Sequence, residues 1–254
     1  MGRRFGQHFL ARKSILDRIA EAACGEGTPL VVEIGPGKGA LTESLLARAA
    51  KIVAIEVDPY LVHYLRQRFA GEIESRRLIL NEGDVLRTDL AQWGEAVVAG
   101  NLPYYITSPI VEKLFAMGDR WVRAVFLVQA EVASRLAAEP GSRDYGYLSV
   151  ETRLFSNPQI LFPVSRTAFR PSPRVDSAVV RLEPATRAMG DREGFLRFAS
   201  AAFRQKRKTL RNNLAPLYGK DRLDGMPQAK QRAEQLGIDA LIDLYRVLTG
   251  REAR

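Results

Sequence analysis

The chain has 254 residues, 46% of them hydrophobic, which is enough for one large domain or for a large and a small one. Its net charge of +9 favours a polyanionic partner, with nucleic acid ahead of a membrane surface. No apolar run approaches the about 18 residues of a membrane span, no signal peptide opens the chain, and one cysteine and two histidines disfavour a disulfide or a zinc site. We therefore expect a cytoplasmic protein with no membrane span and no metal.

The first predicted element is a basic arm at residues 3–13. Four of its cations are predicted to bind RNA: Arg3, Arg4, Arg12 and Lys13. Clustered cations of this kind neutralise the phosphates of a nucleic-acid backbone. Ser14 is predicted to cap the helix that follows, with Asp17 three residues later as its capping-box partner.

A glycine-rich loop follows the first predicted strand. Residues 30–34 predict a strand that runs directly into Gly-Pro-Gly-Lys-Gly at residues 35–39. Glycines in such a loop let a ligand approach the backbone closely. The next strand, at residues 51–56, ends in Glu56, which lies 21 residues after Gly35. This spacing suits a carboxylate that accepts hydrogen bonds from both ribose hydroxyls of an adenosine.

Strands and helices continue to alternate through the first half of the chain. Further strands are predicted at residues 78–80, 96–101 and 123–129, and further helices at residues 58–69, 110–115 and 131–136. This alternation is typical of a doubly wound, Rossmann-like α/β sheet. Asp84 follows the strand at 78–80 and is placed to accept a hydrogen bond from an adenine amine.

A polar cluster, Asn101-Leu102-Pro103-Tyr104, ends the strand at residues 96–101. It lies at the edge of an open α/β sheet where ligands bind. The exocyclic amine of a nucleobase is a poor nucleophile, because its lone pair is shared with the ring. If Asn101 Oδ1 and the Leu102 carbonyl each accept one N–H, the lone pair can be directed at an electrophile. Tyr104 can stack on the base for about 1–3 kcal/mol, and Pro103 holds the preceding carbonyl in an extended backbone. A strand-to-loop turn with an incidental tyrosine is the alternative.

The second half of the chain begins with a predicted helix at residues 146–156. Two late strands are predicted at residues 158–163 and 177–182, joined through a proline-rich loop that contains Phe169. The ring of Phe169 is expected to stack on the second face of the base, and packing in the core is the alternative.

A linker at residues 184–192 separates two predicted domains. Residues 1–184 form the catalytic α/β domain with its basic arm, and residues 185–254 form a small all-α domain that binds RNA. The most basic stretch of the second domain is residues 203–211, which we expect to be helical. Its RNA-binding candidates are Arg204, Lys206, Arg207, Lys208 and Arg211. No acids are interleaved with them, although a solvated helix face commonly alternates signs.

Three kinds of nucleotide ligand are candidates for the glycine loop. A phosphate-binding P-loop requires Gly-Lys-Ser/Thr, but Lys38 is followed by Gly39. A dinucleotide fold requires Gly-x-Gly-x-x-Gly, and the third glycine here comes one residue early. S-adenosyl-L-methionine has no phosphates and needs only the close-approach glycines and the two acids, so it is the predicted cofactor. A purely structural turn is the alternative.

Several motifs together resemble one family. They are Gly-Gln-His-Phe-Leu at 6–10, Val-Glu-Ile-Gly-Pro-Gly-Lys-Gly at 32–39, Glu56-Val57-Asp58, Gly83-Asp84, Asn101 to Tyr104, and Phe-Arg-Pro-Ser-Pro-Arg-Val-Asp-Ser at 169–177. The chain resembles the ribosomal RNA small subunit adenine N(6)-dimethyltransferases of the KsgA/RsmA type. The resemblance runs from about Arg4 to Glu183 and resumes at residues 203–210.

This resemblance implies a Rossmann-like methyltransferase domain followed by a small helical domain. It implies dimethylation of two adjacent adenosines in the 3′-terminal hairpin loop of small-subunit (16S) rRNA during ribosome biogenesis. The implied cofactor-binding residues are His8, Leu10, Gly35, Glu56, Asp84 and Asn101, and Gly37 is predicted with them as a close-approach glycine of the loop. The residues predicted to be catalytic, from the chemistry argued above, are Asn101, Leu102, Pro103, Tyr104 and Phe169. Bacterial members more often have Asn at the position of His8.

The predicted reaction is direct methyl transfer from a sulfonium to the adenine amine, so catalysis is mostly positioning. One alternative is a large-subunit rRNA adenine methyltransferase of the macrolide-resistance type. Others are a non-catalytic rRNA-binding assembly factor and a basic NAD-dependent oxidoreductase, although the latter lacks the sixth-position glycine. The expected partner is the small ribosomal subunit, and the basic composition favours a monomer.

Overall fold

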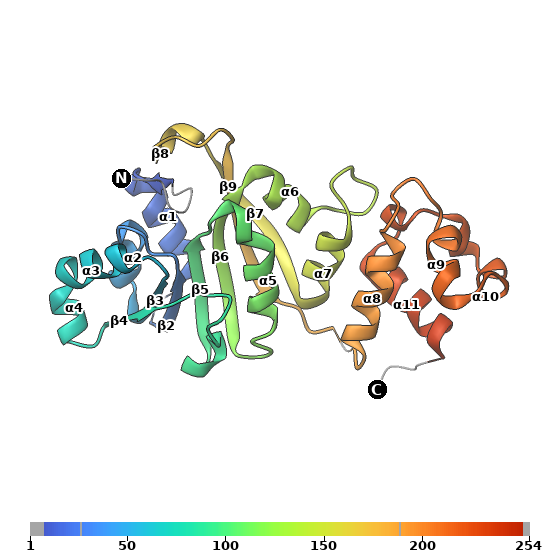
Figure 1. The fold of residues 1–254 in the computed structure, drawn as a ribbon, viewed down its shortest axis with the longest axis horizontal. Coiled ribbons are helices and arrows are strands. Elements are labelled where there is room, and N and C mark those ends of the chain that lie inside the picture. Colours follow the sequence, from blue (N-terminus) through green and yellow to red (C-terminus); the bar gives the residue numbers. More distant parts are fainter. Residues whose placement is uncertain (1–7, 26, 188, 251–254) are drawn as a thin grey trace. The chain divides into compact units, whose positions relative to one another are not determined.

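The computed structural model describes residues 8–25, 27–187 and 189–250. The chain forms two compact units (Figure 1). The first runs up to Ala133 and resumes over Pro158–Pro184, and the second comprises Ser134–Asn157 and the chain from Ala185 onward. The sequence placed the whole stretch up to residue 184 in one domain, whereas the structure groups residues 134–157 with the helical unit.

The first unit is built on a mixed sheet. In the described part of the chain its order is β4-β3-β2-β5-β6-β9-β7. The strands are β2 (Thr28–Ile34), β3 (Ala49–Glu56), β4 (Leu78–Glu82), β5 (Ala96–Asn101), β6 (Trp121–Gln129), β7 (Ser156–Val164) and β9 (Ser177–Pro184). Strands β2 to β6 pair in parallel, and β9 pairs antiparallel with β6. The predicted Rossmann-like α/β fold is confirmed.

Helices flank this sheet (Figure 1). They are α1 (Lys13–Ala23), α2 (Ala40–Leu46), α3 (Pro59–Arg68), α4 (Ala70–Glu74) and α5 (Thr107–Phe115), with 3₁₀ turns η1 (Leu90–Trp93), η2 (Tyr104–Ile106) and η3 (Arg166–Ala168). The boundary between the two units falls within α6 (Ala130–Ala137). Buried residues of α1 and α2, such as Ile19 and Leu45, join those of the strands, such as Val31 and Ile52, in one hydrophobic core. None of the helices in the described ranges is long and apolar enough to cross a membrane.

A short second sheet, made of β1 (Phe9–Leu10) and β8 (Phe169–Arg170), joins segments far apart in the sequence. The two strands pair antiparallel. Ala11 N continues the pairing by donating to Ala168 O at 2.9 Å. This contact brings the start of the described chain to the proline-rich loop, and local sequence patterns did not predict it.

The chain reverses its direction across the sheet between β2 and β5, because β3 and β4 lie on one side of β2 and β5 and β6 on the other. At such a switch point an open α/β sheet binds its ligands. Gly100 allows the two strands to approach here, since a Cβ at this residue would lie 2.6 Å from the backbone oxygen of Ile34. No side chain is compatible with that distance.

The second unit is helical. Its elements are α7 (Tyr147–Phe155), α8 (Arg192–Ala202), α9 (Leu210–Tyr218), α10 (Lys220–Asp224), η4 (Pro227–Lys230), η5 (Ala233–Gln235) and α11 (Ile238–Thr249). Its core contains Val150 and Leu154 of α7 together with Phe195 and Phe198 of α8 and Tyr245 of α11. Because α7 supplies part of this core, it belongs to the helical unit despite its earlier place in the chain.

Candidate active site

A cavity of about 270 Å³ opens where β2, β3, β4 and β5 end. Apart from Phe169, every residue predicted to bind the cofactor or the target base lines it: His8, Leu10, Gly35, Gly37, Glu56, Asp84, Asn101, Leu102, Pro103 and Tyr104. These residues come from the strap formed by β1, from the glycine loop and from the ends of three strands. The fold therefore brings together side chains that lie up to 96 positions apart in the sequence.

Glu56 holds the glycine loop against the end of β3. One of its carboxylate oxygens accepts from Gly37 N at 3.1 Å, and the other accepts from Val57 N and Asp58 N at 3.0 Å each. Gly37 takes a φ of +59°, a left-handed conformation that favours glycine. Burial raises the pKa of Glu56, and these backbone donors act in the opposite direction. The carboxylate is thus fixed in position at the floor of the cavity.

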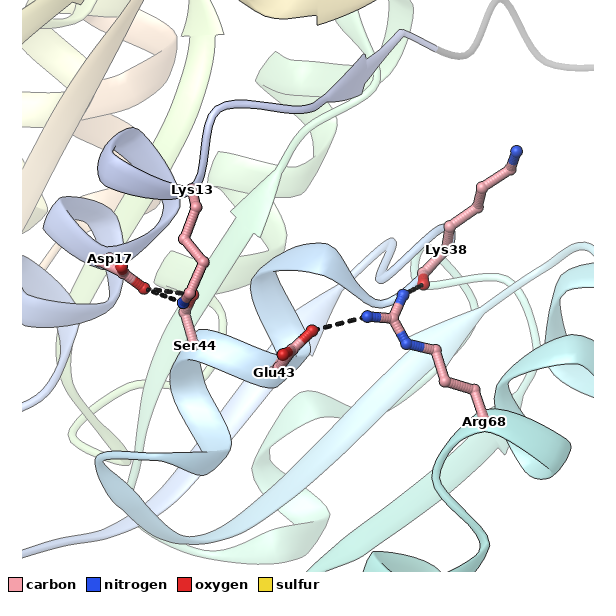
Figure 2. Close-up of polar contacts among 6 residues, drawn as sticks. All are labelled: Lys13, Asp17, Lys38, Glu43, Ser44 and Arg68. Atoms are coloured by element: carbon pink, nitrogen blue, oxygen red, sulfur yellow. Dashed lines mark hydrogen bonds and ion pairs between the residues drawn. The ribbon is translucent and has the colours of Figure 1, made fainter.

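A second contact supports the loop from outside the cavity (Figure 2). Arg68 of α3 donates to the carbonyl oxygen of Lys38 at 2.5 Å and to Glu43 Oε2 at 2.6 Å. Arg68 therefore links the glycine loop to α2 and α3. Since the loop is held both by Arg68 and by Glu56, its backbone is preorganised for close approach of a ligand.

Glu33 is a cavity residue that the sequence reasoning did not single out. It lies within β2, is 1% exposed and lines the cavity. Burial raises the pKa of Glu33 to about 8, and the negative charge of Glu56 adds to this effect. Glu33 Oε2 has no hydrogen-bond partner among the described residues. An acid inside an apolar strand just before the glycine loop was the signal that could have identified it.

Asn101 lies at the end of β5, and its amide is oriented by the backbone of His8, the residue before β1. Asn101 Nδ2 donates to the backbone oxygen of His8 at 3.1 Å. A carbonyl oxygen can only accept, so the amide nitrogen faces His8 and Oδ1 faces the other way. Among the described residues, neither Oδ1 of Asn101 nor the Leu102 carbonyl accepts a hydrogen bond. Two acceptors are therefore available at the cavity.

Tyr104 is half-buried beside them. Its hydroxyl lies 2.8 Å from Ser177 Oγ, and its ring stacks against the ring of His8 with a centroid separation of 6.0 Å and an interplanar angle of 26°. His8 Nδ1 lies 2.9 Å from the carbonyl oxygen of Pro171, so this nitrogen is the donor. The structure thus gives His8 a defined place beside Tyr104.

The prediction for Phe169 is wrong in this structure. Its ring is 0% exposed and belongs to the core of the α/β unit, next to β1 through the β1–β8 pairing. A base cannot stack on a ring without accessible surface. The prediction failed because aromatic spacing in a loop does not reveal which rings the pairing of distant strands will bury.

The family model described as ribosomal RNA adenine dimethylase matches residues 1–249. The chain belongs to the ribosomal RNA adenine dimethylase family. It is therefore an enzyme, a dimethylase that uses S-adenosyl-L-methionine to methylate adenine in ribosomal RNA. The alternatives of a non-catalytic assembly factor and an NAD-dependent oxidoreductase do not agree with this assignment.

Relatives and solved structures resemble the dimethylase over nearly its whole length. It is 44% identical over 261 residues to the Acidobacterium capsulatum protein named "Ribosomal RNA small subunit methyltransferase A", covering 98% of this chain and 91% of that one. A namesake from Chlorobium phaeobacteroides is 40% identical over 247 residues, covering 96% and 89%. The structure of a dimethyladenosine transferase from Plasmodium falciparum has a TM-score of 0.83 at 26% identity, covering 97% and 100%. That of the 23S rRNA methyltransferase ErmE has a TM-score of 0.74 at 26% identity, covering 95% and 99%.

The cations predicted at the start of the dimethylase have different environments. Arg3 and Arg4 lie outside the described residues. Arg12 is exposed. Lys13 Nζ lies 2.8 Å from Asp17 Oδ1, which also accepts from the Ser44 hydroxyl (Figure 2). The predicted capping box is wrong, because α1 already begins at Lys13 and Asp17 bonds to these two side chains instead.

The basic stretch 203–211 is not the helix that the sequence predicted. Helix α8 ends at Ala202 and α9 begins at Leu210, so the intervening residues form an exposed turn, which we call the basic turn (residues 203–209). Asn213 Nδ2 donates to the carbonyl oxygens of Ala202 at 2.7 Å and Gln205 at 3.1 Å. This side chain satisfies one carbonyl at the end of α8 and one within the basic turn, and thereby favours the break.

The predicted RNA-binding cations of this region also differ from one another. Arg211, in α9, pairs with Asp224, and Lys206 Nζ donates to the carbonyl oxygen of Arg143 at 2.9 Å. Arg204, Arg207 and Lys208 are exposed and form no ion pair within the described part of the chain. These three cations are therefore the ones available to a polyanion. In the same described ranges, no cluster of His, Cys, Asp or Glu side chains could hold a metal ion.

Proposed function

We propose that this dimethylase methylates the N6 amines of two adjacent adenosines in the 3′-terminal hairpin loop of small-subunit (16S) rRNA. It would act in the cytoplasm, as a monomer, during ribosome biogenesis. The curated relatives named for the small subunit are 38–44% identical to the chain, against 26% for the 23S rRNA enzyme. The observation that carries the chemistry is the pair of available acceptors, Asn101 Oδ1 and the Leu102 carbonyl, at the rim of the cavity.

The cavity fits the cofactor by the chemistry of its donors and acceptors. Glu56 would accept from the ribose hydroxyls, and Asp84 from the adenine amine. Gly35 and Gly37 would let the ligand approach the loop, and His8 and Leu10 would cover it. S-adenosyl-L-methionine supplies a methyl group on a sulfonium, which is already a good leaving group. No phosphate-binding residue is needed, in agreement with a loop that lacks a Lys-Ser/Thr pair.

The target adenine would enter beside Asn101 and Tyr104. Oδ1 and the Leu102 carbonyl would each accept one N–H and so direct the nitrogen lone pair toward the methyl group. Tyr104 would stack on the base, which offsets part of the few kcal/mol needed to unstack it. The proton would leave to solvent after transfer, so no strong general base is required. The helical unit would contribute RNA affinity through the basic turn.

A single assay tests the substrate. The purified full-length protein is incubated with labelled S-adenosyl-L-methionine and either small-subunit particles, large-subunit particles or their naked RNAs. We expect two methyl groups on each of two adjacent adenosines of the small-subunit substrate. Labelling confined to large-subunit RNA would replace the proposal with the macrolide-resistance alternative.

Removing the available cations of the basic turn should weaken RNA binding without affecting the cofactor. In a protein with Arg204, Arg207 and Lys208 all changed to Ala, we expect weaker binding to small-subunit particles. The slope of log K against the logarithm of the salt concentration should become less steep by about 0.7–0.9 for each phosphate that the variant no longer neutralises. Cofactor affinity should be unchanged, because the substitutions lie in the helical unit and the cavity is lined by the α/β unit. Titrations at several salt concentrations measure both the RNA affinity and its salt slope.

The matched control removes the same charge elsewhere. Arg48, Lys51 and Arg76 are exposed cations of the α/β unit. Their combined change to Ala lowers the net charge equally and is expected to leave the salt slope nearly unchanged. If both triple variants behave alike, the effect is one of overall charge and the basic turn makes no specific contact.

A further inference from the structure

The hydroxyl of Tyr104 makes a contact that stacking on a base does not require. It lies 2.8 Å from the hydroxyl of Ser177, the first residue of β9, and Ser177 is 0% exposed. Buried hydroxyls are nearly always hydrogen-bonded, because an unpaired one loses its hydration without compensation. Each of the two hydroxyls therefore has the other as its partner.

This hydrogen bond crosses one strand of the sheet. Tyr104 follows β5 and Ser177 begins β9, while β6 lies between these two strands. Ser177 itself is held rigidly, since it pairs with Gln129 of β6 and the preceding carbonyl of Asp176 accepts from Ala130 N at 3.0 Å. Because its backbone is fixed, the Ser177 hydroxyl can hold the phenol end of the Tyr104 side chain in one position.

The Tyr104 ring is thereby held at both its face and its end. The His8 ring lies against one face, and His8 is in turn fixed by the Pro171 carbonyl and by Asn101. Burial raises the pKa of Tyr104, so the phenol keeps its proton at neutral pH and the link to Ser177 persists. These contacts fix the plane of the Tyr104 ring relative to Asn101.

We propose that Ser177 is a positioning residue for methyl transfer, acting by fixing the plane of Tyr104 against which the target adenine stacks. The inference rests on the proposed function, because it assigns Tyr104 to the target base. Without the hydrogen bond the ring of Tyr104 and its stacking area remain, but the ring adopts a wider range of orientations. Fewer bound complexes then have the amine in line with the methyl group. The loss falls on kcat, while KM for the RNA changes little.

The test is a double-mutant cycle in the full-length protein. Ser177→Ala and Tyr104→Phe each remove the hydrogen bond and should each lower kcat by about 3- to 10-fold, the usual effect of one neutral hydrogen bond. The double variant should be no slower than either single one, and Ser177→Thr should restore most of the rate. Tyr104→Ala should be much slower, because it removes the ring. Cofactor affinity should stay constant throughout.

A matched control separates positioning from stability. Ser44 is also a buried serine, 4% exposed, whose hydroxyl donates to Asp17 at 2.7 Å (Figure 2). Ser44→Ala should lower thermal stability about as much as Ser177→Ala but leave kcat unchanged. In addition, the time-resolved fluorescence of 2-aminopurine at the target position should report a broader distribution of stacked states only in the Ser177 and Tyr104 variants.

Three results would overturn the proposal: a wild-type kcat in Ser177→Ala, multiplicative losses in the double variant, or equal kcat losses in Ser44→Ala. The failure of the proposed function would look different. In that case the wild-type protein itself would not label the small-subunit substrate, and the cycle would be measured on whichever RNA it does label.

Discussion

Replacing Asn101 with alanine is expected to slow methyl transfer by about 100- to 1,000-fold, the effect of removing one preorganised hydrogen-bonding group from an active site. The amide is positioned before the substrate arrives, because its Nδ2 already donates to the His8 carbonyl at 3.1 Å. Oδ1 is thus left to accept from the adenine amine in the reacting geometry. Alanine removes that acceptor and also releases the β1 strap from the end of β5.

Single-turnover methyl transfer at saturating cofactor measures this effect most directly. Calorimetric cofactor titration and an RNA-binding titration must accompany it, since Asn101 also lines the cavity proposed for the cofactor. The matched control is Asn157→Ala, an exposed asparagine in β7, which is expected to behave like the wild type. A variant that lost RNA affinity as steeply as rate would show that Asn101 binds the substrate rather than orienting its amine.

Replacing Glu56 with alanine should weaken cofactor binding by at least about 100-fold. Two charge-assisted hydrogen bonds to ribose hydroxyls, each contributing about 1.5–3 kcal/mol, account for such a loss. The substitution also leaves three backbone N–H groups without their acceptor, those of Gly37, Val57 and Asp58. The loop then loses its attachment to β3, so the loss should exceed that of Glu56→Gln, which keeps one acceptor oxygen.

Isothermal titration of S-adenosyl-L-methionine checks this expectation, and thermal unfolding shows whether the loop alone has been loosened. Glu82 is a suitable control, because it pairs with Glu56 across β3 and β4 but is exposed and does not line the cavity. Glu82→Ala should bind the cofactor normally. RNA affinity should barely change in either variant, and wild-type cofactor affinity in Glu56→Ala would refute the assignment.

Acidification should weaken cofactor binding through the same carboxylate. Burial raises the pKa of Glu56 above the ordinary value for a glutamate. Protonation removes the charged acceptor. As the pH is lowered, the affinity should therefore begin to fall at a higher pH than it would if Glu56 had the pKa of a solvent-exposed glutamate. Cofactor titrations over a series of pH values measure this midpoint, and the transition should be smaller in Glu56→Gln, which leaves Glu33 as a titrating carboxyl of the cavity.

The cavity that we propose for the cofactor was predictable from sequence, because the signals for its lining residues are local. Each strand contains a short apolar run, and the candidate residue lies at or just after the end of the strand: Glu56 is the last residue of β3, and Asp84 comes two residues after β4. Parallel strands bring their carboxyl ends to one edge, so the order along the chain is enough to place these residues together. Ligand chemistry then follows from the residue types.

The errors concern side-chain and strand contacts that local patterns do not reveal. Whether residues 203–209 continue a helix depends on Asn213, which satisfies one carbonyl at the end of α8 and one in the basic turn. Whether Phe169 faces a ligand depends on its pairing with β1, about 160 positions earlier. The capping of α1 depends on Ser44, which competes for Asp17. Helical periodicity and capping motifs contain no information on such partners.

The helical unit is assembled from two stretches of chain that the end of the α/β unit separates. Part of the core of this unit is synthesised before β7 and β9, namely Tyr145, Val150 and Leu154. The residues that these side chains pack against belong to α8, α9 and α11, which are synthesised after β9. During synthesis these apolar side chains therefore lack their core partners until the last quarter of the chain has been made. The same arrangement constrains recombination between relatives. A crossover at residue 184 would join α7 of one parent to the helices of another, whereas segments 134–157 and 185–254 exchanged together would preserve a complete core.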